Sequence, residues 1–390
     1  MGRERFGPRA AMYDAENRFP TENYDDLRQA GLLALLIPAE HGGMGADYAT
    51  YCFVSAELAR WCGSTALSYN MHSCTMMWSG FVADDLPMDD ETRAAHNTRR
   101  AGIYRLVLEE DALFAQPFSE PQTDLTSGRE PFGATAVRVE GGWRLNGRKH
   151  FASLAGAATH YGILCTETPA DGSTGAGAAP SFRHTLYLAV AADSPGFSVS
   201  GEWDVLGMRA TMSRDLLLDD VFVPDAMTVM PSGAYFLAAR DWPHIFMTIS
   251  PTYLGLAEAA VDFAIAYMKG EVEGSPRSGS PTMTKQLALA ECQIRVQEAR
   301  ALMLRTMAEA RYRPTPGARM RTMMCHRTMS KVAHEVTGEV LRICGGRALF
   351  KRFPLERMHR DARAGAVMLP WTADICMERV AEMTFGRPPG

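Results

Sequence analysis

The sequence of 390 residues lacks the signs of a secreted, metal-binding or membrane-spanning protein. None of its eight cysteines belongs to a Cys-x-x-Cys pair, and several lie within apolar runs, so we expect buried, reduced thiols rather than disulfides or a metal site. No apolar run approaches the roughly 20 residues that span a bilayer. The first residues, Met1 to Arg5, contain no hydrophobic signal region, so we expect a cytoplasmic protein.

A large excess of charge of either sign is also missing. The chain has 40 Lys and Arg against 45 Asp and Glu, a formal net charge of −5. Bulk electrostatics therefore offers no basic surface for nucleic acid. The hydrophobic fraction of 46% and the charged fraction of 22% are typical of a globular protein. The length allows two or three packed domains.

Residues 1–112 are expected to form an N-terminal helical domain. Apolar side chains recur at steps of three and four after Asp47, which predicts one face of a helix. These side chains are Tyr51, Val54, Leu58 and Trp61. A second helix is expected over residues 67–82.

Residues 113–225 are expected to form a central β domain. Residues 135–139 alternate in polarity, a Gly-Gly turn follows, and the chain returns over residues 143–146, which predicts a hairpin. Further strands are expected over 186–191 and 215–223. The stretch 169–180 is rich in Gly, Ala and Ser, which predicts a surface loop.

Residues 226–390 are expected to form a C-terminal helical domain. Three long periodic segments are joined by short links rich in Gly and Pro, and this pattern is typical of an antiparallel bundle. The segments cover residues 254–268, 284–310 and 320–344.

Several segments together resemble the acyl-CoA dehydrogenase family, flavoproteins that put a double bond next to a thioester carbonyl. The C-terminal signature is carried by Gly345-Gly346 and by Arg360-Asp361-Ala362-Arg363. Residues 204–211 and 219–224 resemble the family's Lys-x-Gly-Met-Arg-x-Ser and Phe-x-x-Val-x-Val-Pro segments. The resemblance implies an α+β fold, mainly α, with an N-terminal helical domain, a central β-barrel or sandwich and a C-terminal four-helix bundle.

Two segments resemble the parts of the family that lie against the ring of FAD. Residues 114–121 resemble Ala-x-x-x-Thr-Glu-Pro, which implies that Gln116, Phe118 and Ser119 contact the cofactor, with the Ser119 hydroxyl replacing that of threonine. Lys149 to Ser153 resembles Lys-x-Trp-Ile-Thr, which implies that the Phe151 ring packs on the flavin and that the Ser153 hydroxyl approaches its N5 edge. Taken alone, Ser119-Glu120-Pro121 is typical of a turn or a helix start, and Phe151 alone is typical of a core residue.

Other residues are implied to bind FAD across a subunit contact. Arg342 with Gly345-Gly346 resembles Gln-x-x-Gly-Gly, whose backbone approaches the adenosine end of FAD from a neighbouring subunit, so a homotetramer or homodimer is expected. The same residues are compatible with a helix C-cap and a solvated cation at a helix end. Arg277 and Gln286 stand near the family's pyrophosphate-binding Arg-x-x-Phe-Gly segment, but the phenylalanine is absent. Weaker FAD binding, or FMN in its place, is therefore an open alternative.

The usual catalytic glutamate of the family is missing. Its place aligns with Leu369 or Pro370, and a second base position known in the family aligns with Ile245, so none of these can take a proton. His244 and His72 are the remaining candidate bases, because an imidazole is competent near neutral pH. A hydrogen-bonded structural role is the alternative for each histidine.

Three functions are compatible with a chain that resembles the family but lacks its catalytic glutamate. The first is FAD-dependent α,β-dehydrogenation of an acyl-CoA or acyl-carrier thioester in fatty acid metabolism, with a non-standard base and an electron-transfer flavoprotein as acceptor. The second is a flavin-dependent monooxygenase served by a flavin reductase, which needs no α-proton base. The third is a non-catalytic flavin-binding subunit of a hetero-oligomer.

Overall fold

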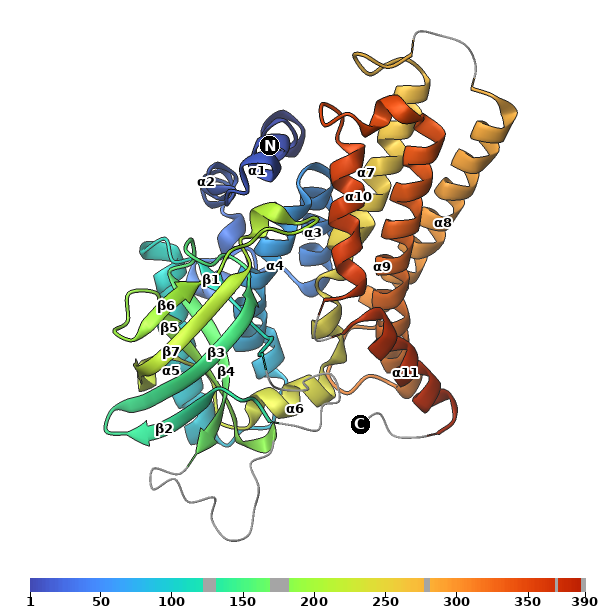
Figure 1. The fold of residues 1–390 in the computed structure, drawn as a ribbon. Coiled ribbons are helices and arrows are strands. Elements are labelled where there is room, and N and C mark those ends of the chain that lie inside the picture. The colour runs from blue at the N-terminus through green and yellow to red at the C-terminus, as the bar shows by residue number, and fades with distance from the viewer. Residues whose placement is uncertain (122–130, 169–181, 277–280, 369–370, 387–390) are drawn as a thin grey trace.

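The computed structural model describes residues 1–121, 131–168, 182–276, 281–368 and 371–386. Helices from both ends of the chain flank a mixed β-sheet that the middle of the chain forms (Figure 1). The predicted order of a helical region, a β region and a second helical region is confirmed.

The N-terminal helices begin where side chains cap them. Asp47 accepts a hydrogen bond from the backbone N–H of Thr50 at 2.8 Å, and Asp89 accepts one from that of Thr92 at 2.7 Å, which satisfies backbone donors at two helix starts. The helix expected after Asp47 therefore begins there. The helices are α1 (Gly7–Glu16), α2 (Thr21–Gln29), α3 (Tyr48–Trp61), α4 (Gly63–Met77) and α5 (Asp90–Glu109).

The described strands form one mixed sheet with the order β6-β7-β3-β2-β4-β5-β8, and β1 pairs with β4. β2 and β3 make the predicted hairpin, in which Val139 pairs with Gly142. β1 and β2 run parallel to β4, and the other neighbouring pairs are antiparallel. The strands are β1 (Phe114–Ala115), β2 (Thr135–Val139), β3 (Gly142–Ala152), β4 (His160–Thr168), β5 (Thr185–Ala191), β6 (Phe197–Ser200), β7 (Arg214–Pro224) and β8 (Thr228–Met230).

The C-terminal helices pack around α9. α7 and α8 lie along α9, and α10 packs on both α7 and α9 (Figure 1). A further helix, α11, lies against the start of this bundle on α9. The helices are α6 (Ala234–Asp241), α7 (Ser250–Met268), α8 (Met283–Ala308), α9 (Pro316–Cys344), α10 (Leu355–Arg363) and α11 (Ala373–Thr384).

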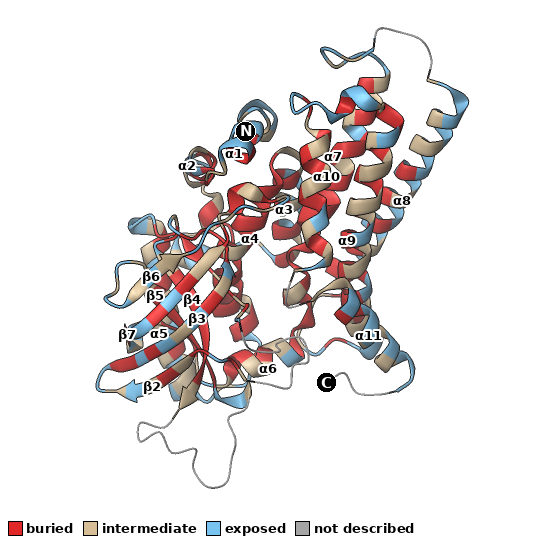
Figure 2. Ribbon diagram, viewed as in Figure 1, coloured by how far each residue is buried: buried red, intermediate tan, exposed pale blue. Residues whose placement is uncertain are grey.

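Helix α4 lies between the sheet and the bundle. It contacts β1 on one side and α3 and α7 on the other, and it is buried along its length (Figure 2). Met71 is the only residue of α4 that is partly exposed rather than buried. A helix enclosed in this way joins two halves of the core. Its partly exposed residue, Met71, lines a cavity.

The cysteines agree with the expectation of reduced thiols. All eight are free and buried, and burial raises the pKa of Cys74, for example, to about 12. Among the described residues, no three side chains of His, Cys, Asp or Glu are close enough to hold a metal ion. No helix in the described part of the chain is long and apolar enough to cross a membrane.

Candidate functional site

A cavity of about 350 Å³ lies where α4, the sheet and α10 meet. Its size is within the range of small-molecule sites. Five separate segments supply its wall, so it exists only in the folded chain. The lining residues are Leu67 and Met71 of α4; Gln116, Phe118 and Ser119 after β1; Phe151 and Ser153 at the end of β3; Trp203, Val205, Leu206, Gly207, Met208, Thr211 and Ser213 before β7; and Arg360, Arg363, Ala364, Val367 and Met368 at the end of α10.

Strained backbone gathers around this cavity. Phe151, Leu154, Met208 and Met212 have φ angles of 53°, 65°, 54° and 48°, values that non-glycine residues rarely adopt. The Phe151 ring is 63% exposed, although a large aromatic side chain is usually buried. Such strain persists only where the surrounding structure holds it, and it collects at functional sites. The exposed ring therefore offers a flat apolar surface to a ligand.

Three hydroxyl groups form a connected chain beside the Phe151 ring. The Oγ atoms of Ser153 and Ser213 are 2.8 Å apart, and the Oγ of Ser213 is 2.7 Å from Oγ1 of Thr211. Thr211 in turn donates to the backbone oxygen of Met208 at 2.8 Å. Ser153 and Ser213 are each 6% exposed and Thr211 is fully buried, so little water competes for these bonds.

A buried ion pair fixes the loop that carries Ser119. Lys149 Nζ lies 2.5 Å from Glu120 Oε1 and also donates to the backbone oxygen of Leu164 at 2.6 Å. Glu120 accepts further hydrogen bonds from the N–H groups of Gly133 and Ala134. Burial pushes the pKa of Glu120 upward, but Lys149 and these two amides outweigh burial and hold it below its usual value. The pair thus ties the Ser119 loop to β3.

The cavity continues past Gln116 and Phe118 into a recess of about 70 Å³. Ile245, at the family's second base position, lines this recess and is buried. Aromatic side chains close it: the Trp78 ring lies 4.7 Å from that of Tyr235 and 5.9 Å from that of Phe246. A space this small admits a small group and excludes a long chain.

Gln116 stands where the cavity joins the recess and lines both. Its Oε1 is buried and has no hydrogen-bond partner among the described residues. A buried polar atom without a partner costs free energy, so a bound molecule that donates to it would stabilise the site. The free amide oxygen, the exposed Phe151 ring and the Ser119 and Ser153 hydroxyls fit a flat heteroaromatic ligand with polar edges.

His72 does not face the cavity as a free base. Its Nε2 bonds to the backbone oxygen of Leu33 at 2.8 Å, and its Nδ1 accepts from the backbone N–H of Phe114 at 3.1 Å. Burial lowers the pKa of His72 to about 4. Since both ring nitrogens are occupied by backbone groups, the candidate role as a base gives way to a structural one that joins β1 to the N-terminal helices.

His244 lies outside the described lining of both the cavity and the recess. Its ring is fully buried beside Trp242, at 5.9 Å between ring centroids, and neither ring nitrogen has a partner among the described residues. Burial lowers its pKa to about 4. The lining residues Ile245 and Phe246 are its neighbours in sequence, but the imidazole itself is not placed to take a proton from a ligand there.

The charged groups at the cavity belong to the end of α10. Arg360 and Arg363 both line it, and Arg360 pairs with Asp14 at 2.6 Å. Asp361 lies behind the wall, where its Oδ1 accepts from the Met208 N–H at 2.5 Å, and burial raises its pKa to about 6. No carboxylate and no imidazole occurs in the described lining of the cavity or the recess.

The predicted cofactor residues divide into two sets. Gln116, Phe118, Ser119, Phe151 and Ser153 come together in the cavity.

The second set lies away from the cavity in a single chain. Gln286 is exposed and donates to the backbone oxygen of Pro281, and Arg342 pairs with Glu339 of its own helix. A Cβ atom at Gly345 or Gly346 would meet nothing within 4 Å, so both glycines face open space. Their role across a subunit contact remains a prediction. Arg277, Leu369 and Pro370 lie outside the described residues.

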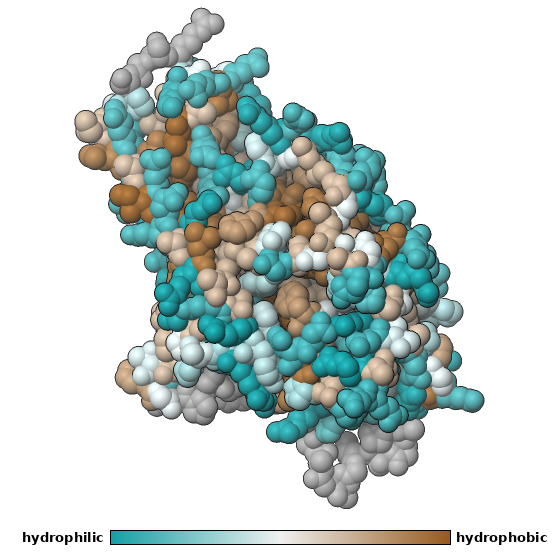
Figure 3. All heavy atoms as spheres, turned by 180° about the vertical axis from the view of Figure 1, so that it is seen from behind, coloured by the Kyte–Doolittle hydropathy of each residue, from teal (hydrophilic) through white to brown (hydrophobic). Residues whose placement is uncertain are grey.

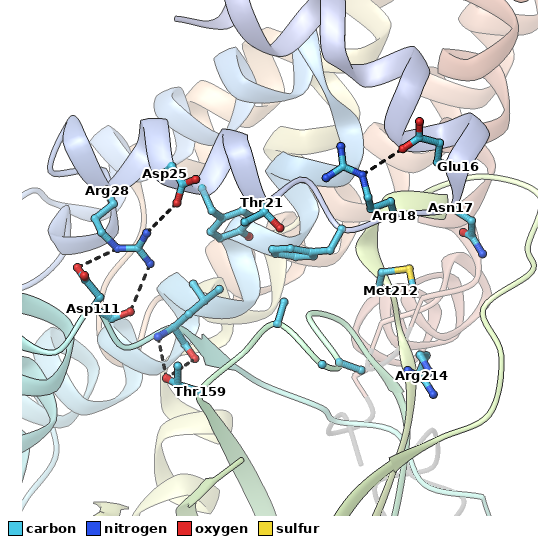
Figure 4. A pocket seen from close by; sticks show the side chains of 16 residues that line it. Glu16, Asn17, Arg18, Thr21, Asp25, Arg28, Asp111, Thr159, Met212 and Arg214 are labelled. Atoms are coloured by element: carbon cyan, nitrogen blue, oxygen red, sulfur yellow. Dashed lines mark hydrogen bonds and ion pairs between the residues drawn. The ribbon is translucent and has the colours of Figure 1, made fainter. Parts of the chain in front are cut away.

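A second, more open cavity of about 840 Å³ lies between the α1–α2 connection and the sheet (Figure 4). Met212 and Arg214 face this space, whereas the alternate residues Thr211 and Ser213 face the first cavity. Its charged side chains pair with one another, for example Arg28 with Asp25 and Asp111 (Figure 4). The pair of Arg28 and Asp111 links α2 to the segment before β1.

Comparison with known proteins gives the family. Three domain models of the acyl-CoA dehydrogenases match the chain: the N-terminal domain over residues 2–82, the middle domain over 115–221 and the C-terminal domain over 247–369. The chain belongs to the acyl-CoA dehydrogenase family. All five segments of the cavity wall fall within the matched ranges.

The relatives of this acyl-CoA dehydrogenase family member carry different activities in their names. The chain is 28% identical to the putative acyl-CoA dehydrogenase YdbM of Bacillus subtilis, over 93% of this chain and 89% of the relative. It is equally 28% identical to L-evernosamine nitrososynthase of a Micromonospora species, over 94% of this chain and 84% of the relative. The solved structure of KijD3 with FMN and dTDP-3-amino-2,3,6-trideoxy-4-keto-3-methyl-D-glucose superposes with a TM-score of 0.82 at 25% identity, covering 98% of this chain and 91% of that one.

Sequence reasoning missed three residues of the cavity wall. Thr211 lies in a segment recognised only for its family resemblance, and Ser213 follows it by two positions. The signal available was this spacing, which places two hydroxyls on one face of an extended chain. Trp203, whose indole N–H donates to the Met208 oxygen at 3.3 Å, carried no signal in the sequence.

Proposed function

We propose that this chain is a flavin-dependent monooxygenase that acts on a small molecule. The observation that carries the proposal is the absence of a carboxylate or imidazole from the described lining of the cavity and its recess. Dehydrogenation next to a thioester carbonyl needs a base that removes the α-proton. Oxygen insertion needs no such base, because the substrate is attacked rather than deprotonated.

The cavity suits a flavin as the cofactor. When bound, a reduced flavin supplies the two electrons that let one oxygen atom enter the substrate while the other leaves as water. Phe151 would offer a surface for the ring, and the hydroxyls of Ser119 and Ser153, which are 9% and 6% exposed, would supply hydrogen bonds to its polar edge. FAD would also engage Arg342 and Gly345-Gly346 of a neighbouring subunit, whereas FMN would not.

The recess limits the part of the substrate that enters it to a small or compact group. Its volume of about 70 Å³ and its aromatic wall leave no straight path for a long acyl chain. Gln116 is the polar group at its entrance, so a substrate with one N–H or O–H donor suits it best. The nitrososynthase among the relatives, and the amino sugar bound in KijD3, are consistent with such a donor.

A flavin reductase and a second copy of the chain are the proposed partners. Hydrophobic side chains are exposed on the bundle, as the rear view of Figure 3 shows, and Leu287 and Ile294 of α8, 63% and 54% exposed, lie seven residues apart on one helix face. Such a stripe supports a homotetramer or homodimer.

Anaerobic mixing tests this function against its competitors. The flavin-loaded protein should keep its oxidised flavin absorbance when acyl-CoA thioesters of several chain lengths are added without oxygen. After reduction by NADH and a flavin reductase, it should consume oxygen and place ¹⁸O from ¹⁸O₂ into indole or an amino-sugar nucleotide. Bleaching by an acyl-CoA alone would instead make it a dehydrogenase with a non-standard base, and failure to bind any flavin would overturn both enzyme functions.

A further inference from the structure

The chain of hydroxyl groups from Ser153 through Ser213 and Thr211 ends at a backbone oxygen, which can only accept a hydrogen bond. The backbone oxygen of Met208 has no hydrogen to give, and Thr211 Oγ1 lies 2.8 Å from it. Two oxygen atoms at this separation need a hydrogen between them, because lone pairs alone would repel. Thr211 has one hydroxyl hydrogen, so that hydrogen points to Met208.

This end fixes the direction of the other two hydrogen bonds. Ser213 lies 2.7 Å from Thr211 Oγ1, and since Thr211 has already used its hydrogen, Ser213 must donate. Ser153 lies 2.8 Å from Ser213, whose hydrogen is now used as well, so Ser153 donates to Ser213. The Ser153 hydroxyl therefore turns its hydrogen away from the cavity and presents only lone pairs to it.

The family resemblance implies that the Ser153 hydroxyl approaches N5 of a bound flavin, and a lone pair there would discriminate between the two redox states of the flavin. The N5 atom of an oxidised flavin accepts a hydrogen bond, whereas reduced flavin carries an N5–H that donates one. We propose that Ser213 and Thr211 are positioning residues that make Ser153 an acceptor toward the cavity and so favour reduced flavin over oxidised flavin. The inference rests on the proposed flavin site, but it holds whether the bound flavin serves oxygenation or dehydrogenation.

The midpoint potential of the bound flavin tests the proposal without any substrate. In Ser213→Ala, the Ser153 hydrogen loses its acceptor and can turn into the cavity, where it would stabilise oxidised flavin. In Thr211→Val, the Ser213 hydroxyl loses its acceptor and can donate to Ser153 instead. The Ser153 hydrogen would then also turn into the cavity and stabilise oxidised flavin. Both variants should lower the potential, and a tenfold loss of preference for reduced flavin corresponds to about 30 mV for a two-electron couple.

Two further variants act as controls. Thr211→Ser keeps the hydroxyl and should keep the wild-type potential, and Ser153→Ala, which neither donates nor accepts, should fall between wild type and Ser213→Ala. Potentials of Ser213→Ala and Thr211→Val equal to or above that of wild type would overturn the assignment. Loss of flavin binding by both, while Thr211→Ser binds normally, would also overturn it, because the hydroxyls would then be structural. Either result can be told apart from a wrong overall function, since neither depends on turnover.

Discussion

At the scale of single residues, the Gln116 side chain stands between the recess and the cavity that contains Phe151. Gln116 contacts both spaces, and its Oε1 is buried without a partner among the described residues. An unpaired acceptor in an apolar pocket rejects molecules that cannot donate to it, because the atom then stays desolvated and unsatisfied. Gln116 is therefore placed to select substrates by a single hydrogen bond.

Replacing Gln116 with Leu should remove this selection. Indole and benzothiophene have nearly the same shape, but only indole has an N–H donor. The flavin-loaded wild-type protein should bind indole about tenfold more tightly than benzothiophene, in line with the roughly 1–3 kcal/mol cost of an unsatisfied buried group. Gln116→Leu should bind both equally, as measured by perturbation of the flavin absorbance.

Gln116→Glu serves as the matched control for that comparison. A carboxylate keeps the acceptor oxygen and nearly the same length, so it should retain the preference for indole. Equal binding of the two probes by the wild-type protein would show that Oε1 does not meet the ligand.

The same scale shows which predicted residues the structure brings to one cavity, while their contact with a flavin stays a prediction. Phe151, Ser153 and Ser119 belong to two short segments that resemble segments of the family in residue type and spacing. The structure brings all three residues to one cavity. His72 was selected for its chemistry, but whether an imidazole is free depends on backbone groups that lie far away in sequence, here those of Leu33 and Phe114. Hydrogen-bond partners of this kind cannot be inferred from composition or period.

At the scale of elements, the site depends on β3 and the loop after β1 holding a common register. The buried pair of Lys149 and Glu120 makes this link, with side chains 0% and 2% exposed. The ammonium group also lies 4.7 Å from the centre of the Phe132 ring. A charge so enclosed is tolerated only while its partner is present.

Substituting Lys149 with Met should destabilise the fold severely. The change leaves the Glu120 carboxylate buried without its cation, which typically costs about 3–5 kcal/mol. Urea unfolding followed by circular dichroism would measure the loss, and the double variant Lys149→Met/Glu120→Gln should recover part of it. The exposed pair of Arg342 and Glu339 is the matched control, and Arg342→Gln should leave the free energy of unfolding unchanged within error. An equally small effect at Lys149 would mean that the loop is held by its other contacts.

Elements with a strong local pattern could be predicted from the sequence, and those defined by long-range pairing could not. The β2–β3 hairpin and helices α7, α8 and α9 were expected close to their observed bounds, because alternation and helical period are local signals. β4 was not expected: six of its nine residues are buried, so polarity does not alternate along it. Helix α6 and strand β6 are short, and their formation depends on neighbours elsewhere in the chain.

At the scale of the whole molecule, buried histidines make stability depend on pH. Burial lowers the pKa of His72, His96, His244 and His326 to about 4 each. The unfolded chain binds these protons near the ordinary value of about 6.5, so it takes up more protons than the folded chain between about pH 6.5 and 4. Stability is therefore full above that window and falls as the pH drops through it. Asp361 acts in the opposite sense, because its pKa is raised to about 6, and offsets part of the loss below that value.

Replacing His244 with Phe should flatten this pH dependence. Its ring has no hydrogen-bond partner among the described residues, so an apolar ring of similar shape loses no bond. The difference in unfolding free energy between variant and wild type should change by up to about 1.4 kcal/mol for each pH unit between 6 and 4.5. Urea denaturation at a series of pH values measures the slope, and flavin binding at pH 7.5 should be retained. An unchanged slope would mean that His244 is hydrated in solution, and loss of flavin binding would return it to the list of site residues.

The five-part wall of the cavity has a consequence for the order in which the protein is made. Residues 67–71 leave the ribosome long before residues 360–368, yet both are needed to enclose a ligand. Flavin capture must therefore come at the end of synthesis, after nearly the whole polypeptide has emerged and its halves have docked. A cofactor that binds only this last state draws the folding equilibrium toward it, so flavin supply in the cell would set how much of the newly made chain survives.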